Sequence, residues 1–451
     1  GESAVNQAPI TGESVPVDKK PCDIVFAGTI NGAGSLEIKV TKIAGDTTLA
    51  RIIRLVEEAQ EQQAPTQRFV DVFARHYTPA VTAVALLVFL IPPLLMDGDW
   101  STWLYRSCVL LIIACPCALV ISTPVSIVAG LTALARRGVL VKGGAHLETI
   151  GRLKGLAVDK TGTITEGKPK VIGVEVLGSS NEEEVLRIAA AIDDHSAHPL
   201  AKAFVDGHAY FVGNHRFTHE LGICSEEVEN RLAAIEEKGQ SVVVVGHRPH
   251  DDCKGEVLGI IAIGDTLRPN AKDAIAALHA SGVEEVVMLS GDNQRTADFI
   301  ARQVGIDQAR GDLLPDQKVE AVKVLREKLG VVGMVGDGVN DAPAMATASV
   351  GIAMGAAGTD AAIETADIAL MQDDLGKIAE TIRLGKRTLR IIHFNIAFAL
   401  SLKAVFLVLT LIGYASLWFA ILADTGATLL VIANSLRLLA TPKSARNKDA
   451  G

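Results

Sequence analysis

Long apolar segments alternate with polar stretches along the 451-residue chain, and they fall into two pairs. The first pair covers residues 77–96 and 107–135, and the second covers residues 391–412 and 416–436. Each segment reaches the roughly 20 residues that an α-helix needs to cross a membrane. Because short turns separate the members of each pair, the pattern predicts two membrane-spanning helical hairpins. The alternative for each run is a buried helix of a soluble protein.

Two short apolar runs in the long middle region end in carboxylates. Residues 156–158 lead into Asp159-Lys160-Thr161-Gly162-Thr163, and residues 331–335 lead into a glycine-rich turn that carries Asp337 and Asp341. A carboxylate can attack a γ-phosphoryl group where a hard cation and fixed donors neutralise the charge of the transferring oxygens. The two later aspartates offer oxygen ligands for that cation. The plainer alternative is that Asp159 caps a turn at a strand end.

Composition agrees with a membrane protein. The chain is 49% hydrophobic with only 4% aromatic residues, and its mean hydropathy is positive. A formal net charge of -9 argues against general binding of nucleic acid, since no long basic tract is present. Six cysteines in so long a chain do not make a disulfide framework, so we expect the soluble parts to lie in a reducing cytoplasm.

Basic residues predict the orientation in the membrane. They cluster on one side of the predicted hairpins, and the opposite turns carry none except Arg106. Cytoplasmic loops are enriched in lysine and arginine, so both termini and the middle region are predicted to be cytoplasmic. The clustered residues are Arg68, Arg75, Arg136, Arg137, Lys142, Lys386, Arg387, Arg390, Arg437 and Lys443.

Three features inside the predicted spans point to metal chemistry. Cys115-Pro116-Cys117 places two thiols beside a proline that frees a backbone carbonyl, and thiolates select soft or borderline ions such as Zn²⁺, Cd²⁺, Pb²⁺ or Cu⁺. Lys403 and Asp424 interrupt the last two apolar runs, where ionisable residues are costly and usually functional. Asp424 can ligate a divalent ion with the two cysteines, and Lys403 can pair with Asp424 when the ion is absent. A purely structural lysine–aspartate pair is the alternative.

Taken in order along the chain, these segments resemble the motifs of the P-type ATPases, which are cation pumps. The thiols, Lys403 and Asp424 resemble the heavy-metal branch that exports Zn²⁺, Cd²⁺ or Pb²⁺, whereas the Tyr-Asn and Met-Ser features expected of copper pumps are lacking. The resemblance implies a multidomain membrane protein. It would combine an α-helical transmembrane bundle, an α/β haloacid-dehalogenase-like phosphorylation domain, an α+β nucleotide-binding insertion and a partial β-rich actuator domain.

The implied domain limits follow the motifs. They are 1–63 for the partial actuator domain, 64–137 for the first helix pair, 138–167 and 257–386 for the two parts of the phosphorylation domain, 168–256 for the shortened nucleotide-binding domain, 387–440 for the second helix pair and 441–451 for the C-terminal tail.

The resemblance also assigns site residues. It makes Asp159 the phosphorylated nucleophile and Glu13, within Thr-Gly-Glu-Ser, the base that activates water. The further catalytic residues are Lys160, Thr161, Thr163 and Lys318. The residues implied to bind ATP are Asp193, His198, Pro199, Gly213, Asn214, Ser290, Gly291 and Asp292. The implied magnesium ligands are Asp159, Thr161, Asp337 and Asp341, and the transported ion would be bound by Cys115, Cys117, Lys403 and Asp424.

The implied activity is ATP-driven export of a divalent heavy-metal ion through an aspartyl phosphate, with Mg²⁺ and ATP, in a bacterial-type plasma membrane. Its partners would be ATP, the metal ion and membrane lipid, with no nucleic acid. A Cu⁺ exporter and a soluble dehalogenase-type phosphatase are rival interpretations of the same residues.

Two departures from the family pattern favour a further interpretation, in which the chain is a remnant that does not transport. Roughly 30 residues that the family has between His198 and Gly213, including a Gly-x-Gly turn, are missing here. The chain also begins inside the actuator domain, so a missing N-terminal half of the same gene product is expected.

Overall fold

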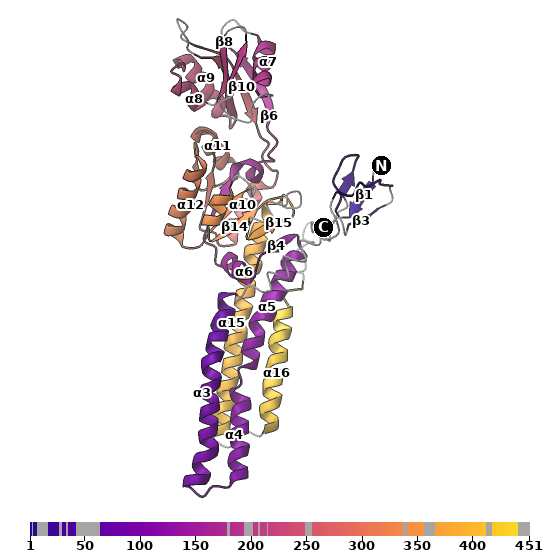
Figure 1. Ribbon diagram of the computed structural model, residues 1–451, viewed down its shortest axis with the longest axis vertical. Coiled ribbons are helices and arrows are strands. Elements are labelled where there is room, and N and C mark those ends of the chain that lie inside the picture. Colours follow the sequence, from indigo (N-terminus) through magenta and orange to yellow (C-terminus); the bar gives the residue numbers. More distant parts are fainter. Residues whose placement is uncertain are drawn as a thin grey trace, which may run out of the picture. The chain divides into compact units, whose positions relative to one another are not determined.

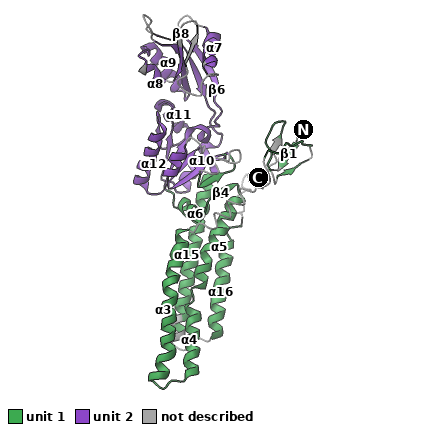
Figure 2. Cartoon of the chain, viewed as in Figure 1, with its two compact units in different colours: residues 1–153, 355–372, 377–451 green, residues 154–354, 373–376 purple. Residues whose placement is uncertain are grey.

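A computed structural model describes residues 1, 3–6, 17–26, 29–32, 35–41, 64–177, 181–193, 202–205, 208–213, 215–248, 255–336, 341–355, 366–411 and 417–440. The chain divides into two compact units, which Figure 2 shows in different colours. The first unit comprises Gly1–Leu153, Gly355–Gln372 and Lys377–Gly451, and the second comprises Lys154–Met354 and Asp373–Gly376.

The first unit is dominated by a bundle of long helices (Figure 1). Among the described residues, four segments are long and apolar enough to cross a membrane, which confirms the two predicted pairs. The helices are α3 Pro65–Leu95, α4 Trp100–Ala114, α5 Cys117–Ala135, α15 Gly376–Leu411 and α16 Leu417–Leu436. Both α3 and α15 begin well before their apolar runs, because helical hydrogen bonding continues beyond the residues that a membrane core would cover.

The second predicted span begins earlier than expected and is broken in the middle. Asp99 caps the start of α4, since its Oδ2 accepts a hydrogen bond from the Thr102 backbone N–H at 2.8 Å. The break falls between Cys115 and Cys117, where Pro116 has no N–H to donate to the preceding turn. The span therefore consists of α4 and α5, with a break in the helical hydrogen bonding between them.

Buried polar side chains connect three helices of the bundle. The Ser126 and Ser435 hydroxyl oxygens lie 2.8 Å apart, and Asn395 Nδ2 donates to Ser435 Oγ at 3.1 Å. All three residues are almost fully buried. In an apolar environment such hydrogen bonds stabilise helix association by about 0.6–2 kcal/mol each.

The first unit also contains short strands. An antiparallel sheet near the N-terminus has the order β2-β1-β3, formed by β1 Ser3–Asn6, β2 Val17–Lys19 and β3 Ile30–Asn31. After α5, β4 Val139–Val141 pairs antiparallel with β15 Ile368–Leu370, and α6 Gly144–Gly151 follows β4. The small sheet agrees with the expected β-rich actuator fragment.

The second unit contains a parallel sheet in which β5 is central. Its strand order is β12-β11-β5-β13-β14. The strands are β5 Gly155–Asp159, β11 Glu285–Leu289, β12 Gln308–Arg310, β13 Val332–Gly336 and β14 Val350–Ala353. The accompanying helices are α10 Ala271–Ala280, α11 Gln294–Val304, α12 Pro315–Leu329 and α13 Ala342–Thr347.

Burial explains why the apolar runs become the central strands. Every residue of β5 and β13 is buried, as parallel strands covered on both faces require. Val322 and Leu325 of α12 pack in one hydrophobic cluster with Ala157 and Met334. This packing fixes the carboxyl ends of β5, β11 and β13 at one edge of the sheet.

An antiparallel five-stranded sheet is inserted after the β5 loop. Its strand order is β6-β10-β9-β8-β7. The strands are β6 Lys170–Val176, β7 Lys202–Val205, β8 His208–Gly213, β9 Ser241–His247 and β10 Glu256–Gly264, and the helices are α7 Glu182–Asp193, α8 His215–Glu220 and α9 Glu226–Glu236.

The predicted limit of the nucleotide-binding insertion at residue 256 is too early. Strand β10 pairs with both β6 and β9, so the sheet extends to Gly264. The sequence alone could not show this, because β10 is an apolar run that suits either sheet. In the region expected to be shortened, β7 and β8 form an antiparallel hairpin at the edge of the sheet.

Burial within the inserted sheet predicts which side chains stabilise it. Ile260 is fully buried in the cluster that contains Phe211 and Leu232, whereas Ile172 of the neighbouring β6 is 58% exposed. We expect Ile260→Ala to lower the local free energy of unfolding by about 2–5 kcal/mol, and Ile172→Ala to change it by less than about 1 kcal/mol. Hydrogen exchange of the β9 and β10 amides measures both. Equal loss of protection in the two variants would contradict this packing.

Candidate catalytic and membrane sites

Three parallel strands bring the predicted phosphorylation residues to one sheet edge. Asp159 ends β5, Ser290 directly follows β11, and Asp341 lies shortly after the end of β13. Open α/β sheets bind ligands outside the carboxyl ends of their strands. The structure therefore gathers residues that are up to 182 positions apart, 341 minus 159, at the place where such a fold carries its chemistry.

One lysine joins two buried carboxylates at this edge. Lys318 Nζ, from the first turn of α12, donates to Asp159 Oδ1 at 2.6 Å and to Asp341 Oδ1 at 2.8 Å. The Asp159 and Asp341 side chains are 10% and 2% exposed. The second oxygen of Asp159, Oδ2, accepts the Thr161 backbone N–H at 2.9 Å. Both oxygens of the predicted nucleophile are therefore held in fixed directions.

One ammonium group carries a single positive charge, so Lys318 cannot neutralise the negative charges of both Asp159 and Asp341. Burial raises the pKa of Asp159 to about 6, and the charge of Asp341 adds to this effect, while Lys318 opposes it. Burial works to lower the pKa of Lys318, but the two carboxylates outweigh it and raise that pKa above its usual value. Asp159 is consequently ionised near neutral pH, as a nucleophile must be.

Two glycines allow Asp159 and Asp341 to approach the same lysine, Lys318. Gly162 has a φ of 73°, in the left-handed region that favours glycine, and it lets the chain turn sharply after Asp159. A Cβ atom added to Gly336 would lie 2.5 Å from Asp341 Oδ2 and 2.7 Å from Asp341 Cβ. Any larger residue at position 336 would therefore push Asp341 away from the sheet edge.

A second ion pair lies beside the first. Lys160 Nζ pairs with Asp292 Oδ2, and Asp292 also accepts hydrogen bonds from Ser290 Oγ at 3.1 Å and Ser241 Oγ at 2.8 Å. Burial works to raise the pKa of Asp292, but the Lys160 ammonium and these hydroxyl donors hold it below its usual value. The structure thus brings Ser290 and Asp292 next to Lys160–Ile164, the segment after Asp159 that we call the phosphorylation loop because phosphorylation is predicted at Asp159.

Asp265 and Arg268 were missed in the sequence, although they hold the loop after Asp159. Arg268 donates to the Gly162 and Thr163 carbonyl oxygens at 2.8 and 3.0 Å. Asp265 accepts the backbone N–H groups of Gly167 and Lys168, both at 3.1 Å. The signal that could have found them is a pair of charged residues directly after the buried run of β10.

The residues at the sheet edge fit Mg²⁺. Asp159 and Asp341 supply two carboxylates that share the ammonium group of Lys318 among the described residues, and carboxylate oxygens are the ligands that this hard cation prefers. Thr163 is fully buried and its hydroxyl has no hydrogen-bond partner among the described residues, so it can donate to an added oxygen atom.

Several predicted residues lie outside the described part of the chain. These are Glu13, His198, Pro199, Asn214 and Asp337. Asp193 ends α7, but its side chain is likewise outside the described part. Gly213 ends β8 on the five-stranded sheet, and Gly291 lies between Ser290 and Asp292.

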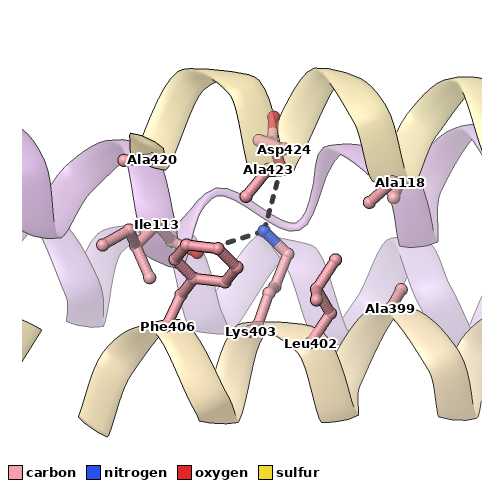
Figure 3. A pocket seen from close by; sticks show the side chains of 10 residues that line it. Ile113, Ala118, Ala399, Leu402, Lys403, Phe406, Ala420, Ala423 and Asp424 are labelled. Carbon is pink, nitrogen blue, oxygen red and sulfur yellow. Dashed lines mark hydrogen bonds and ion pairs between the residues drawn. The ribbon is translucent and has the colours of Figure 1, made fainter. Parts of the chain in front are cut away.

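The membrane bundle contains a second centre, shown in Figure 3. Lys403 Nζ, from α15, lies 3.1 Å from Asp424 Oδ1 on α16 and 3.1 Å from the Ile113 carbonyl oxygen, and it also donates to the Cys115 carbonyl oxygen. These are carbonyl groups freed by the break at Pro116. A small pocket between the helices is lined by both charged residues and by apolar side chains such as Ile113 and Phe406.

The two predicted thiol ligands lie at the same break. Cys115 is the last residue before it and Cys117 begins α5, and the structure joins their sulfur atoms in a disulfide. A thiolate is the form that binds metal, so this pair can ligate an ion only after reduction. The Cys115 carbonyl group is already bound by Lys403, which brings the thiols, the lysine and Asp424 into one neighbourhood.

Comparison with known proteins identifies the family of the chain. A family model described as a haloacid dehalogenase-like hydrolase matches residues 153–349, and one described as a P-type ATPase actuator domain matches residues 1–57. A crystal structure of a zinc-transporting PIB-type ATPase in its E2.Pi state superposes with a TM-score of 0.64 at 43% identity, over 97% of this chain and 75% of that one. The chain belongs to the P1B-type heavy-metal ATPases.

The sequences of other P1B-type ATPases are equally similar. A probable cadmium-transporting ATPase of Staphylococcus aureus (strain MRSA252) is 46% identical over 97% of this chain and 64% of that protein. A zinc/cadmium/lead-transporting P-type ATPase of Escherichia coli (strain K12) is 45% identical over 97% of this chain and 62% of that protein. The predicted family and fold class are confirmed, and the chain spans less than two thirds of the length of these two relatives.

The Lys403–Asp424 pair should couple the stabilities of α15 and α16. Each side chain is about one-fifth exposed, and loss of either partner leaves the other charge without its counterion. We expect the destabilisation of the Lys403→Met, Asp424→Asn double variant to be smaller than the sum of the single variants by about 1–2 kcal/mol. Chemical unfolding in detergent measures all four proteins of this cycle. Additive effects would show that the pair contributes no coupling energy.

Proposed function

We propose that this chain carries out ATP-driven export of a divalent heavy-metal ion, Zn²⁺, Cd²⁺ or Pb²⁺, through an aspartyl phosphate on Asp159. The observation that carries the proposal is the ion pair between Lys403 and Asp424 at the broken helix with two cysteines. A soluble phosphatase would not need an ion pair inside a bundle of membrane-spanning helices. The names of the related proteins, which specify cadmium, zinc and lead, support the same class of substrate.

The membrane residues suggest how the ion is taken up and expelled. In the reduced chain, the thiolates of Cys115 and Cys117 and the carboxylate of Asp424 would bind the ion, because soft and borderline metals accept this ligand set. Lys403 would then lose its carboxylate partner. When the Lys403 ammonium returns to Asp424, it competes with the ion for that carboxylate and favours release.

The sheet edge supports phosphoryl transfer to Asp159. A carboxylate oxygen of Asp159 attacks the γ-phosphorus of ATP, the new O–P bond forms, the bond to the β-phosphate oxygen breaks, and ADP leaves. Lys318 stays beside the transferred group, while the Thr161 backbone, Thr163 and Ser290 offer hydrogen bonds. Asp159, Thr161, Asp337 and Asp341 would hold Mg²⁺, which neutralises charge on the transferring oxygens.

The return half of the cycle would use the actuator segment. Glu13 would take a proton from water, the water oxygen would attack the phosphorus, and the O–P bond to Asp159 would break to release inorganic phosphate. The bacterial relatives support a bacterial-type plasma membrane as the location of this chain. Because the basic residues cluster on one side of the predicted spans, the termini and the soluble domains would face the cytoplasm.

Phosphoenzyme formation tests the chemistry directly. In the purified, reduced and lipid-reconstituted chain, γ-labelled ATP with Zn²⁺ should give an acid-stable label that is absent from Asp159→Asn, because the amide is not a nucleophile. Glu13→Ala should accumulate the label, since its hydrolysis is slowed. A labelled Asp159→Asn protein would overturn the assignment of the nucleophile. No label in the parent chain would favour a non-transporting remnant.

Metal dependence tests the membrane centre separately. Asp424→Ala should lose Zn²⁺-stimulated labelling by ATP by about tenfold or more, yet it should still be labelled at Asp159 by inorganic phosphate, a reaction that needs no nucleotide. Asp71→Ala, which changes an aspartate of α3 outside the pocket, serves as the matched control. If Cu⁺ stimulated labelling and Zn²⁺, Cd²⁺ and Pb²⁺ did not, the chain would be a copper exporter instead.

A further inference from the structure

A group of four metal-ligating side chains lies in the inserted sheet domain, apart from both centres described above. His215 and His219 project from α8, Cys224 follows that helix, and Glu229 belongs to the first turn of α9. Their ligand atoms all lie within 4.8 Å of one another. The two histidines are one helical turn apart, which places their rings on one face of α8, stacked with centroids 5.1 Å apart.

The distances within this group suit a tetrahedral ion. Ligand atoms about 2.0–2.3 Å from a zinc ion lie roughly 3.3–3.7 Å from one another. His215 Nε2 and His219 Nε2 are 3.3 Å apart, and Cys224 Sγ is 3.5 Å from Glu229 Oε2. Glu229 Oε2 is closer to the two Nε2 atoms, at 2.7 and 3.0 Å, which are hydrogen-bond distances. Replacing these hydrogen bonds by an ion requires shifts of less than about 1 Å.

The surroundings of His215 are those of a metal ligand. Its other ring nitrogen, Nδ1, lies 2.9 Å from Glu236 Oε1, and the Glu236 side chain is 1% exposed. A carboxylate that accepts the second ring N–H fixes the histidine tautomer and leaves Nε2 free to bind a metal. His219 is 57% exposed, so an ion from solvent has direct access to the group.

We propose that His215, His219, Cys224 and Glu229 form a binding site for Zn²⁺ or Cd²⁺ in the cytoplasmic nucleotide-binding domain. Two nitrogens, a thiolate and a carboxylate are a ligand set that borderline divalent metals prefer over Mg²⁺ and Ca²⁺. The charges also balance. The thiolate and Glu229 neutralise the ion, and the guanidinium group of Arg295 remains to pair with Glu236.

The site would connect metal binding to the contact between α9 and α11. Arg295, from α11 of the parallel-sheet domain, lies 3.5 Å from Glu229 Oε1 and 3.4 Å from Glu236 Oε2. An ion bound to Glu229 withdraws negative charge from Arg295 and weakens one of these two pairs. Asp292 lies three residues before Arg295 in the chain and pairs with Lys160 beside the phosphorylation loop. A metal ion bound at this site would therefore change the rate at which the chain uses ATP.

Zinc binding to the whole 451-residue chain tests the site. A Cys115→Ser, Cys117→Ser, Asp424→Asn background removes the membrane ligands, and this protein, in detergent and stripped of metal, is titrated with Zn²⁺ against a chromophoric chelator. We expect about one zinc per chain. His219→Gln and Cys224→Ser should each weaken binding tenfold or more, whereas Cys22→Ser, which changes an exposed cysteine elsewhere, should leave it unchanged.

A second measurement reports on the thiol itself. In the same background, Zn²⁺ should slow alkylation of Cys224 by at least tenfold, with Cys22 in the same molecule as the reference, and Co²⁺ should give a thiolate charge-transfer band that Cys224→Ser lacks. No retained zinc, or zinc binding that His219→Gln and Cys224→Ser leave unchanged, would overturn the site. Neither result would bear on export, since the background already lacks the transport ligands.

Discussion

The sheet-edge centre and the membrane centre of this P1B-type ATPase each depend on one lysine ammonium group that is shared among several oxygen atoms. Lys318 joins Asp159 and Asp341 at the sheet edge, and Lys403 joins Asp424 and two backbone carbonyl groups in the bundle. An unpaired charge in a buried place costs several kcal/mol. Each lysine therefore stabilises its centre while the ligand is absent. In the proposed function, each is also the group that an arriving cation would displace or oppose.

The proline break gives the membrane centre its shape. A continuous helix would satisfy its own carbonyl groups and would leave the lysine with one partner only. Because α4 ends at Ala114 and α5 begins at Cys117, the carbonyl groups of Ile113 and Cys115 lie at the break, and Lys403 binds them together with Asp424. The same break brings the two cysteines to the end of one helix and the start of the next. Backbone and side-chain chemistry are thus combined at one depth of the bundle.

The second unit contains two sheets that position different groups of residues. The parallel sheet fixes Asp159 through buried neighbours on both sides, and the loop behind it is held by Arg268 and Asp265 from the end of β10. The antiparallel sheet carries the histidine, cysteine and glutamate group on α8 and α9. Arg295 of α11 pairs with Glu229 and Glu236 of α9, so it connects helices that belong to the two sheets. A change of charge at Glu229 therefore changes the electrostatic interaction of Arg295.

The sequence by itself determined the two helical pairs, the phosphorylation loop and the chemistry of the membrane residues. Apolar length, proline and thiolate chemistry are local properties that need no partner to be recognised. Tertiary structure decided the shared hydrogen bonds of Lys318 and Lys403, the place of β10 in the inserted sheet, and the meeting of His215 with Glu229. The lysine contacts and the place of β10 depend on strand order and helix packing, which join segments separated in the chain and leave no periodic signal in it. His215 and Glu229 are only 14 residues apart, but their contact depends on how α8 packs against α9.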